Sequence, residues 1–190
     1  MIIYIHGFGS HGNGSKAIAL RNYCKTHNIP FIAPSLSTIP DLAIQTVEEL
    51  IEAIQRFENV SLVGSSLGGY YAMYLSYKYN IPCVLINPAV YSYKTLQRAL
   101  GASPNFYDQS TYEWTVKHLD MLKQYDIESY QGENALLLLQ KGDEVLDYAE
   151  AVAKLPKAHI IIEEGGDHGF KGVERHFDTM IEFLSHQQKH

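Results

Sequence analysis

The chain has 190 residues, of which 46% are hydrophobic and 19% charged, and its formal net charge at pH 7 is -6. This balance is typical of a soluble globular protein and excludes an intrinsically disordered chain. Binding to the phosphate backbone of a nucleic acid requires clustered Lys and Arg. No two Lys or Arg residues are adjacent here, so a nucleic-acid partner is not expected.

The length predicts one domain, residues 1–190. Cys24 and Cys83 are two cysteines in or beside apolar stretches, which predicts buried free thiols and no disulfide framework. No run reaches the 18 apolar residues of a membrane span. The first residues also lack the basic segment of a signal peptide. We therefore expect no membrane span and a cytoplasmic protein.

Short apolar runs alternate with longer periodic segments, a rhythm that predicts βαβ units and a parallel sheet. The short runs are continuously apolar, as strands covered on both faces are. Strands are predicted at Ile2–Ile5, Phe31–Ala33, Val60–Val63, Cys83–Ile86, Ala135–Leu139 and His159–Ile162. Helices are predicted at Lys16–His27, Pro40–Phe57, Leu67–Tyr79, Tyr148–Leu155 and Val173–Leu184. We expect an α/β fold with about six mostly parallel strands and helices on both faces.

An insertion of almost fifty residues separates Ile86 from Ala135, too long for a simple crossover. Short helices are predicted near Lys94–Leu100 and Thr115–Gln124. The insertion is rich in aromatic residues: Tyr91, Tyr93, Phe106, Tyr107, Tyr112, Trp114, Tyr125 and Tyr130. At the carboxyl edge of a parallel sheet it would overhang a ligand site. We expect a helical lid over residues 87–131; the alternative is a helical pair packed on the core.

The third predicted strand ends in a Gly-x-Ser-x-Gly pattern centred on Ser66, and a helix follows at once. This order of strand, tight turn and helix is the context of a nucleophile elbow. The serine of such a turn has a strained backbone, so the residues two before and two after it must be small. Gly64 and Gly68 meet that requirement. Because the pattern alone is common, a catalytic site also needs a base and an acid.

A carboxylate and an imidazole follow two later strands. Asp143 comes directly after Ala135–Leu139, and His168 lies in a Gly-rich loop after the last strand. The chain order Ser66, Asp143, His168 is that of α/β-hydrolases. Asp147 and Asp167 are the rival acids: Asp147 is placed to begin a helix, and Asp167 is the immediate neighbour of the histidine.

Each residue type serves acyl transfer. A serine hydroxyl needs an imidazole to accept its proton, and a carboxylate holds that imidazole in the correct tautomer. The oxyanion that forms needs N–H donors, for which the sequence predicts the backbone amides of Leu67 and Phe8. His6 and Gly7 are expected to support the loop that carries Phe8.

Four motifs together resemble the small YqiA-like esterases of the α/β-hydrolase superfamily. They are HGFGS at 6–10, GSSLGG at 64–69, KGDEVLDY at 141–148 and GGDHGF at 165–170. The resemblance covers nearly the whole chain. It implies a triad of Ser66, Asp143 and His168, and hydrolysis of a small-molecule carboxylic ester or thioester without a cofactor.

Three other functions are open to this sequence. The loop from Gly7 to Gly12 matches Gly-x-Gly-x-x-Gly after a strand, a dinucleotide-binding signal. The acidic residue that should close the second strand is absent from residues 31–35. A metal site at His6, His11 and Asp167 matches no usual ligand spacing. The third is a non-catalytic binding protein with this fold. We predict a serine hydrolase that forms an acyl-enzyme, with no metal.

Overall fold

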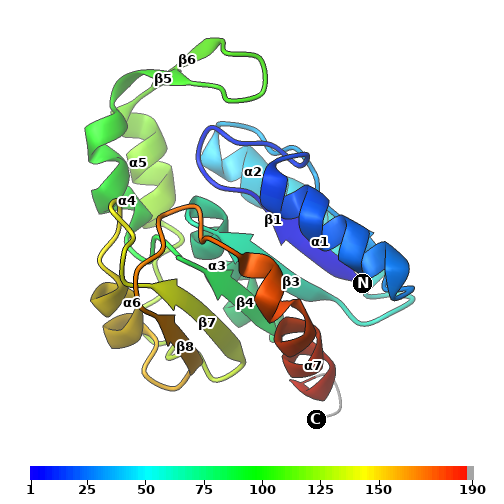
Figure 1. Ribbon diagram of the computed structural model, residues 1–190. Helices are drawn as coiled ribbons and strands as arrows, with labels where there is room; N and C mark the ends of the chain where they lie inside the picture. Colours follow the sequence, from blue (N-terminus) through cyan, green and yellow to red (C-terminus); the bar gives the residue numbers. More distant parts are fainter. Residues whose placement is uncertain (188–190) are drawn as a thin grey trace.

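The structure is a computed structural model that describes residues 1–187 (Figure 1). Residues 188–190, which end the predicted domain, lie outside this description. Within the described part of the chain, no helix is both long and apolar enough to cross a membrane. Cys24 and Cys83 are buried free thiols, as predicted.

Six strands form one parallel sheet, which confirms the predicted architecture. Their order is β2-β1-β3-β4-β7-β8, and each neighbouring pair is parallel. The strands are β1 (Ile2–Ile5), β2 (Phe31–Ile32), β3 (Ser61–Ser65), β4 (Cys83–Ile86), β7 (Ala135–Gln140) and β8 (His159–Glu163). All residues of β1, β3, β4 and β7 are buried. Because both faces of these strands are covered, their sequences are mainly apolar, with small or polar residues at the ends of β3 and β7.

Helices cover both faces of the sheet (Figure 1). Successive side chains of a strand point to opposite faces, and they divide the core into two clusters. Ile2 and Tyr4 pack with α1 (Ser15–Thr26) and α7 (Phe177–Gln187). Ile3 and Ile5 pack with the helices of the opposite face, α2 (Pro40–Ile54), α3 (Leu67–Tyr79), α5 (Val116–Lys123) and α6 (Tyr148–Lys154). A short 3₁₀ helix, η2 (Val173–His176), precedes α7.

The insertion after β4 is not wholly helical, so this part of the prediction is wrong. It contains α4 (Ser92–Thr95), the 3₁₀ helix η1 (Leu96–Ala99) and α5, near the two predicted helices. Between them lies an antiparallel hairpin of β5 (Gly101–Pro104) and β6 (Thr111–Trp114). The backbone amide of Phe106 at its tip donates to the Gly9 carbonyl over 2.8 Å. This contact between distant segments fixes the hairpin against the β1–α1 loop.

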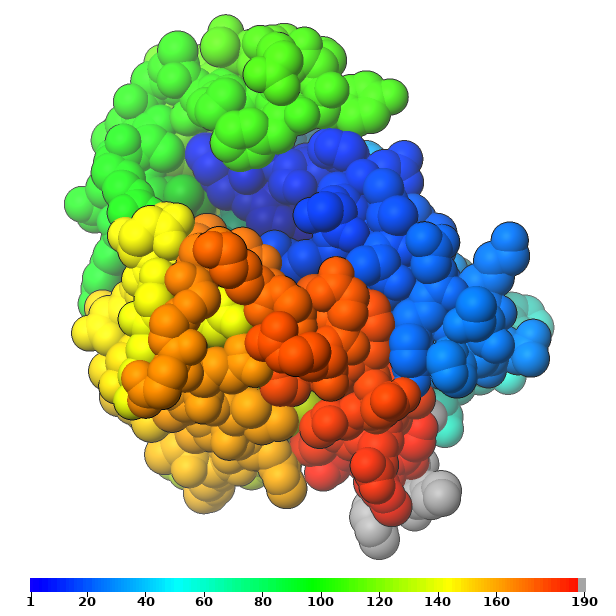
Figure 2. All heavy atoms as spheres, viewed as in Figure 1, coloured from blue at the N-terminus to red at the C-terminus, as the bar shows by residue number. Residues whose placement is uncertain are grey.

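Most aromatic side chains of the insertion pack inward. Trp114 and Tyr130 are buried in the core, and Tyr91, Tyr93, Tyr112 and Tyr125 pack against it. Phe106 and Tyr107 at the hairpin tip are exposed. In Figure 2 the insertion, drawn in green, overhangs the N-terminal segment in blue. The packed alternative therefore describes most of the insertion, and the hairpin tip is the part that reaches over the sheet edge.

Candidate active site

Ser66 lies at a sharp turn between β3 and α3. Its backbone has φ 55° and ψ -119°, a conformation that costs a non-glycine residue roughly 1–3 kcal/mol. The surrounding main chain holds it there: the Ser66 amide donates to the Ile86 carbonyl over 3.1 Å, and the Ser66 carbonyl accepts from the amides of Gly69 and Ala89. These bonds fix the serine above the carboxyl end of the sheet.

Gly64 and Gly68 are packed against main-chain atoms on both sides of this turn. A Cβ atom at Gly68 would lie 2.0 Å from the carbonyl oxygen of Ile5, and one at Gly64 would lie 2.2 Å from the carbonyl oxygen of Gly68. Neither backbone neighbour can rotate away as a side chain does. The strand, the turn and the first turn of α3 therefore approach closely because both positions are glycine.

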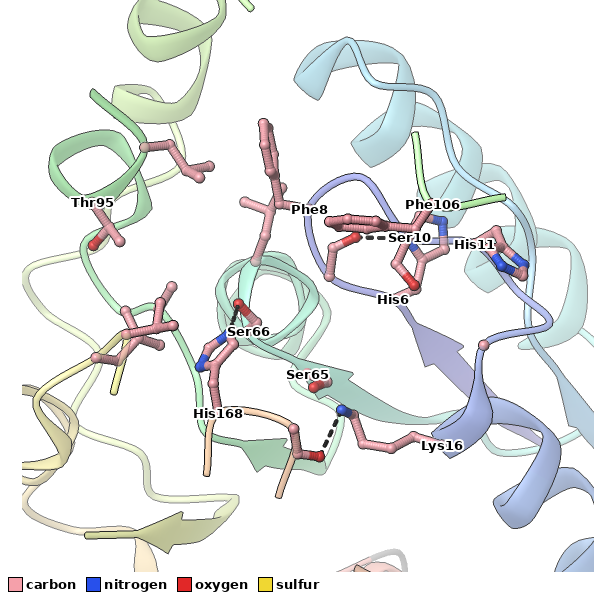
Figure 3. A pocket seen from close by; sticks show the side chains of 18 of the residues that line it. His6, Phe8, Ser10, His11, Lys16, Ser65, Ser66, Thr95, Phe106 and His168 are labelled. Carbon is pink, nitrogen blue, oxygen red and sulfur yellow. Dashed lines mark hydrogen bonds between the residues drawn. The ribbon is translucent and has the colours of Figure 1, made fainter. Parts of the chain in front are cut away.

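The structure brings Ser66, His168 and Asp143 into one hydrogen-bonded row (Figure 3). The Nε2 atom of His168 lies 3.0 Å from Ser66 Oγ, and its Nδ1 atom lies 2.8 Å from Asp143 Oδ2. A proton on Nδ1 faces the carboxylate, so Nε2 presents its lone pair to the serine hydroxyl. This is the arrangement in which an imidazole can accept a proton from the hydroxyl.

Asp143 is held as a carboxylate. Burial alone would raise its pKa, but hydrogen bonds from His168 and from the amides of Leu146 and Val145 outweigh burial and lower the pKa. The two amides donate to Oδ1 over 2.9 and 2.8 Å. A charged acceptor therefore faces His168 Nδ1 at neutral pH.

The two rival acids have other contacts. Asp147 is the N-cap of α6, where its Oδ1 accepts from the Ala149 amide over 2.9 Å. The Asp167 carboxylate lies 3.4 Å from Lys171 Nζ. Asp143 is thus the acid that the structure places on the imidazole of His168.

The β1–α1 loop lies beside Ser66 and is fixed by His6. The Nδ1–H group of His6 donates to the Gly7 carbonyl over 2.9 Å, and Nε2 accepts from the Leu36 amide over 2.8 Å. Burial lowers the pKa of His6, which keeps the ring neutral, as an accepting Nε2 requires. Gly7 packs closely, because a Cβ atom there would lie 3.3 Å from Ser66 Cβ.

Phe8 and Leu67, the predicted oxyanion donors, flank the serine from two elements. Leu67 begins α3, and the first amides of a helix have no carbonyl partner within it. Phe8 lies in the β1–α1 loop, where its ring packs edge-on against Trp114 with centroids 4.8 Å apart. Both residues line the same cavity as Ser66.

Two buried amide side chains beneath the His168 loop are not predicted from the sequence. Asn87 Nδ2 donates to the backbone carbonyls of Asp167 and His168. Asn87 Oδ1 accepts from the backbone N–H of Gln140. Gln140 Oε1 accepts from the amides of Asp167 and Lys171. Asn87 also has a positive φ of 39°, a backbone state that Asn adopts more readily than most residues. Together Asn87 and Gln140 fix the main chain on both sides of His168.

Glu163, the last residue of β8, accepts a hydrogen bond from the Gln140 side chain. Its carboxylate makes the stability of this part of the structure depend on pH. Hydrogen bonds from Gln140 and Arg175 lower the pKa of Glu163 to about 2. A depressed native pKa stabilises the fold above the ordinary glutamate value of roughly 4.3. That contribution is lost as the pH falls toward 2.

Glu163→Gln is expected to lower the free energy of unfolding at pH 7 by about 1 kcal/mol, since water screens this partly exposed group. It should also flatten the loss of stability between pH 4.5 and 2, because the titrating carboxylate is gone. Denaturant unfolding across this range measures both effects. The exposed Glu174→Gln is the control; equal curves for the two variants would contradict the assigned role of Glu163.

A cavity of about 330 Å³ opens over Ser66. Its walls come from the β1–α1 loop, the start of α1, α4 with η1, the loop after Asp143 and the His168 loop. Figure 3 shows Ser66 and His168 between Thr95 on one side and Ser10, His11 and Lys16 on the other. A small molecule can therefore reach the serine hydroxyl from solvent.

The glycines of the 7–12 loop pack against the chain itself. A Cβ atom at Gly9 would lie 2.6 Å from the Pro104 carbonyl oxygen, and one at Gly12 would lie 2.1 Å from that of Ala33. Main-chain packing thus explains why these positions are glycine, and no bound pyrophosphate is needed to explain it. Within residues 1–187, no three His, Cys, Asp or Glu side chains are grouped so that they could hold a metal ion.

Solved structures share this fold over almost the whole chain. Est1E from Butyrivibrio proteoclasticus, solved with ferulic acid, has a TM-score of 0.79 at 12% identity, covering 100% of this chain and 89% of that chain. Mouse alpha/beta hydrolase domain-containing protein 10 has a TM-score of 0.74 at 20% identity, covering 97% and 89%. A monoacylglycerol lipase of Paleococcus ferrophilus has a TM-score of 0.71 at 16% identity, covering 97% and 94%. The predicted α/β-hydrolase fold is confirmed.

Relatives at the sequence level match over almost their full length. A UPF0227 protein of Vibrio parahaemolyticus is 28% identical over 188 residues, which is 96% of this chain and 98% of that protein. The UPF0227 protein YcfP of Salmonella paratyphi B is 24% identical over 193 residues, with the same coverage. The family described as "Uncharacterised protein family (UPF0227)" matches residues 1–185, and the chain belongs to this family.

Proposed function

We propose that the protein is a serine hydrolase that cleaves carboxylic ester or thioester bonds of small-molecule acyl substrates. The observation that carries this proposal is the row of hydrogen bonds from Ser66 Oγ through His168 to Asp143, open to a cavity. Solved proteins of the same fold include an esterase and a monoacylglycerol lipase, which supports ester chemistry for this site.

In the first half of the reaction, Ser66 Oγ attacks the carbonyl carbon while His168 Nε2 takes the hydroxyl proton. The carbon–oxygen double bond opens to an oxyanion. We assign the backbone amides of Phe8 and Leu67 as the donors to this oxyanion, a contribution that typically amounts to a few kcal/mol per donor. The tetrahedral intermediate then collapses, and His168 gives its proton to the departing alcohol or thiol. Ser66 is left as an acyl ester.

In the second half, water replaces the leaving group. His168 Nε2 accepts a proton from the water as its oxygen attacks the acyl carbon. Collapse of the second intermediate breaks the bond to Ser66 Oγ, which takes back the proton. Asp143 remains ionised throughout and stabilises the imidazolium in each half. No cofactor takes part in this sequence.

Phe106 gives the hairpin a role in the same proposal. Its ring lines the cavity although more than half of the side chain is exposed, and its amide is bonded to Gly9 in the β1–α1 loop. We assign the hairpin tip as the lid of this site. Covering the cavity would shield the acyl-enzyme from competing nucleophiles.

A fluorophosphonate probe tests the proposal, because it reacts with an activated serine. We expect one adduct per chain, on the peptide that contains Ser66, detected by mass spectrometry. His168→Ala should slow labelling at least about 100-fold, since the general base is lost. The exposed His27→Ala is the matched control and should label at the normal rate. A chain without an adduct, or with one at another serine, contradicts the proposal.

A further inference from the structure

The charged side chains that line the cavity over Ser66 are opposite in sign to the net charge of the whole chain. The cavity lining includes two cations, Lys16 and Arg98, and no Asp or Glu. The chain as a whole has 21 acidic and 15 basic residues. This local excess of positive charge favours a ligand with negative charge.

Lys16 is the cation that lies inside the cavity wall. Its side chain is half-buried at the start of α1, and Nζ donates to the Gly169 carbonyl over 2.9 Å (Figure 3). An ammonium group has three donors, so this contact leaves two of them for a ligand. Burial lowers the pKa of Lys16 and Asp167 opposes that shift. Asp167, however, has an ion pair of its own with Lys171.

Arg98 occupies a different position. It is exposed, and its Nη1 atom lies 3.5 Å from the Val145 carbonyl. Water and salt screen an exposed charge far more than a half-buried one. Of the two cations, Lys16 is therefore the stronger anchor for a charged group.

The two sides of the cavity differ in polarity. The side of Thr95 is formed by η1 and by the loop after Asp143, which the contact between Arg98 and Val145 joins together. Beside Thr95 and the exposed Arg98, the lining side chains there are apolar: Leu96, Ala99, Val145 and Leu146. Across Ser66, the opposite side carries Ser10, His11 and Lys16. A substrate that spans the serine thus meets an apolar side and a cationic side.

The position of His168 decides which side takes which part of the substrate. The leaving oxygen must come within reach of His168 Nε2 to be protonated. Lys16 is bonded to Gly169, the residue directly after His168, whereas Val145 and Leu146 follow Asp143, which faces Nδ1. On this basis we assign the leaving group to the Lys16 side, whose cation is bonded to the His168 loop, and the acyl group to the apolar side.

We infer that the substrate joins an apolar acyl group to a leaving group that carries a carboxylate or phosphate charge, and that Lys16 binds this charge. The inference rests on the proposed hydrolase function and names its substrate class. A charge-assisted hydrogen bond of this kind corresponds to an effect of about 10- to 100-fold on KM.

The test compares three esters. One is 4-(butyryloxy)benzoate, with the charge in the leaving group, and the second is its neutral methyl ester. The third is monophenyl succinate, with the charge in the acyl group. Lys16→Met should raise KM for the first ester about 10- to 100-fold and change kcat/KM for the neutral ester less than about threefold. Lys16→Arg should retain most of the preference, and the exposed Lys25→Met is the control.

Each other outcome overturns the inference in a recognisable way. Equal losses for charged and neutral esters would mean that Lys16 only supports the His168 loop through Gly169. A preference for monophenyl succinate would place the charge on the apolar side. The same conclusion would follow if the preference for a charged ester were lost in Arg98→Gln and kept in Lys16→Met. Affinity of Ser66→Ala for 4-(butyryloxy)benzoate, with and without Lys16→Met, gives the same comparison without turnover. Failure to hydrolyse any of the esters contradicts the proposed function itself.

Discussion

Replacement of Ser66 by alanine is expected to lower kcat/KM for ester hydrolysis by roughly 10⁴- to 10⁶-fold, the range seen when a triad nucleophile is removed. The hydroxyl is the atom that bonds to the acyl carbon, and its contact with His168 Nε2 is the first step of proton transfer. The loss should appear in kcat, because the cavity that binds the substrate remains.

The fold of this variant should be intact. The strained backbone of Ser66 is held by main-chain hydrogen bonds to Ile86, Gly69 and Ala89, none of which needs the hydroxyl. The free energy of unfolding is therefore expected to change by less than about 1 kcal/mol. Steady-state kinetics and denaturant unfolding on the same preparations separate a chemical loss from a structural one.

Ser65→Ala is the matched comparison. Ser65 is the neighbouring serine and is buried at the end of β3. It lines the same cavity, but its side chain is hydrogen-bonded to Tyr4, whereas Ser66 is bonded to His168. Its removal should lower kcat/KM less than about tenfold. If Ser66→Ala retains activity within tenfold while Ser65→Ala does not, the nucleophile is misassigned.

The sheet is predictable from the sequence because its four inner strands, β1, β3, β4 and β7, are buried on both faces. β1 and β4 are continuous apolar runs of four residues, β7 and β8 contain runs of five and three, and β3 has Leu62 and Val63 between small residues. Apolar runs of this kind can be recognised from the local sequence, without knowledge of distant segments. The chain order of the strands and the α/β rhythm then predict a parallel sheet.

The hairpin β5–β6 could not be predicted in this way. Gly101–Pro104 has the sequence GASP, in which Gly and Pro disfavour strands. What holds it is tertiary: pairing with β6 and the bond from Phe106 to Gly9, almost a hundred residues earlier. A local pattern contains none of this.

The same distinction applies to the site. Ser66, Asp143 and His168 each follow a strand closely, so topology brings them to one edge. Asn87 and Gln140 also stand at strand ends, but their role depends on the path of the loop at 165–171 above them. A polar residue at the end of an apolar strand is the signal that could have identified them.

Gly68 is the residue whose replacement should most disturb the fold around the site. A Cβ atom there would lie 2.0 Å from the Ile5 carbonyl oxygen and 2.6 Å from that of His6. Ile5 belongs to a buried strand and its neighbour His6 is fixed by two hydrogen bonds. Relief of the overlap therefore requires α3 to move away from β1, with loss of packing at the centre of the core.

We expect Gly68→Ala to lower the free energy of unfolding by about 3–5 kcal/mol, at the upper end of single substitutions, because the clash is with backbone. Gly14→Ala is the control, because the φ of Gly14 is -65° and suits alanine. A Cβ atom there would lie 3.3 Å from its nearest neighbour, the hydroxyl oxygen of Ser10. That variant should change stability by less than about 1 kcal/mol. The denaturant midpoints of the two variants, compared at an unchanged m-value, measure the difference in stability. A Gly68→Ala chain as stable as the parent would mean that α3 and β1 can separate without cost, and the close approach that positions Ser66 would lose its explanation.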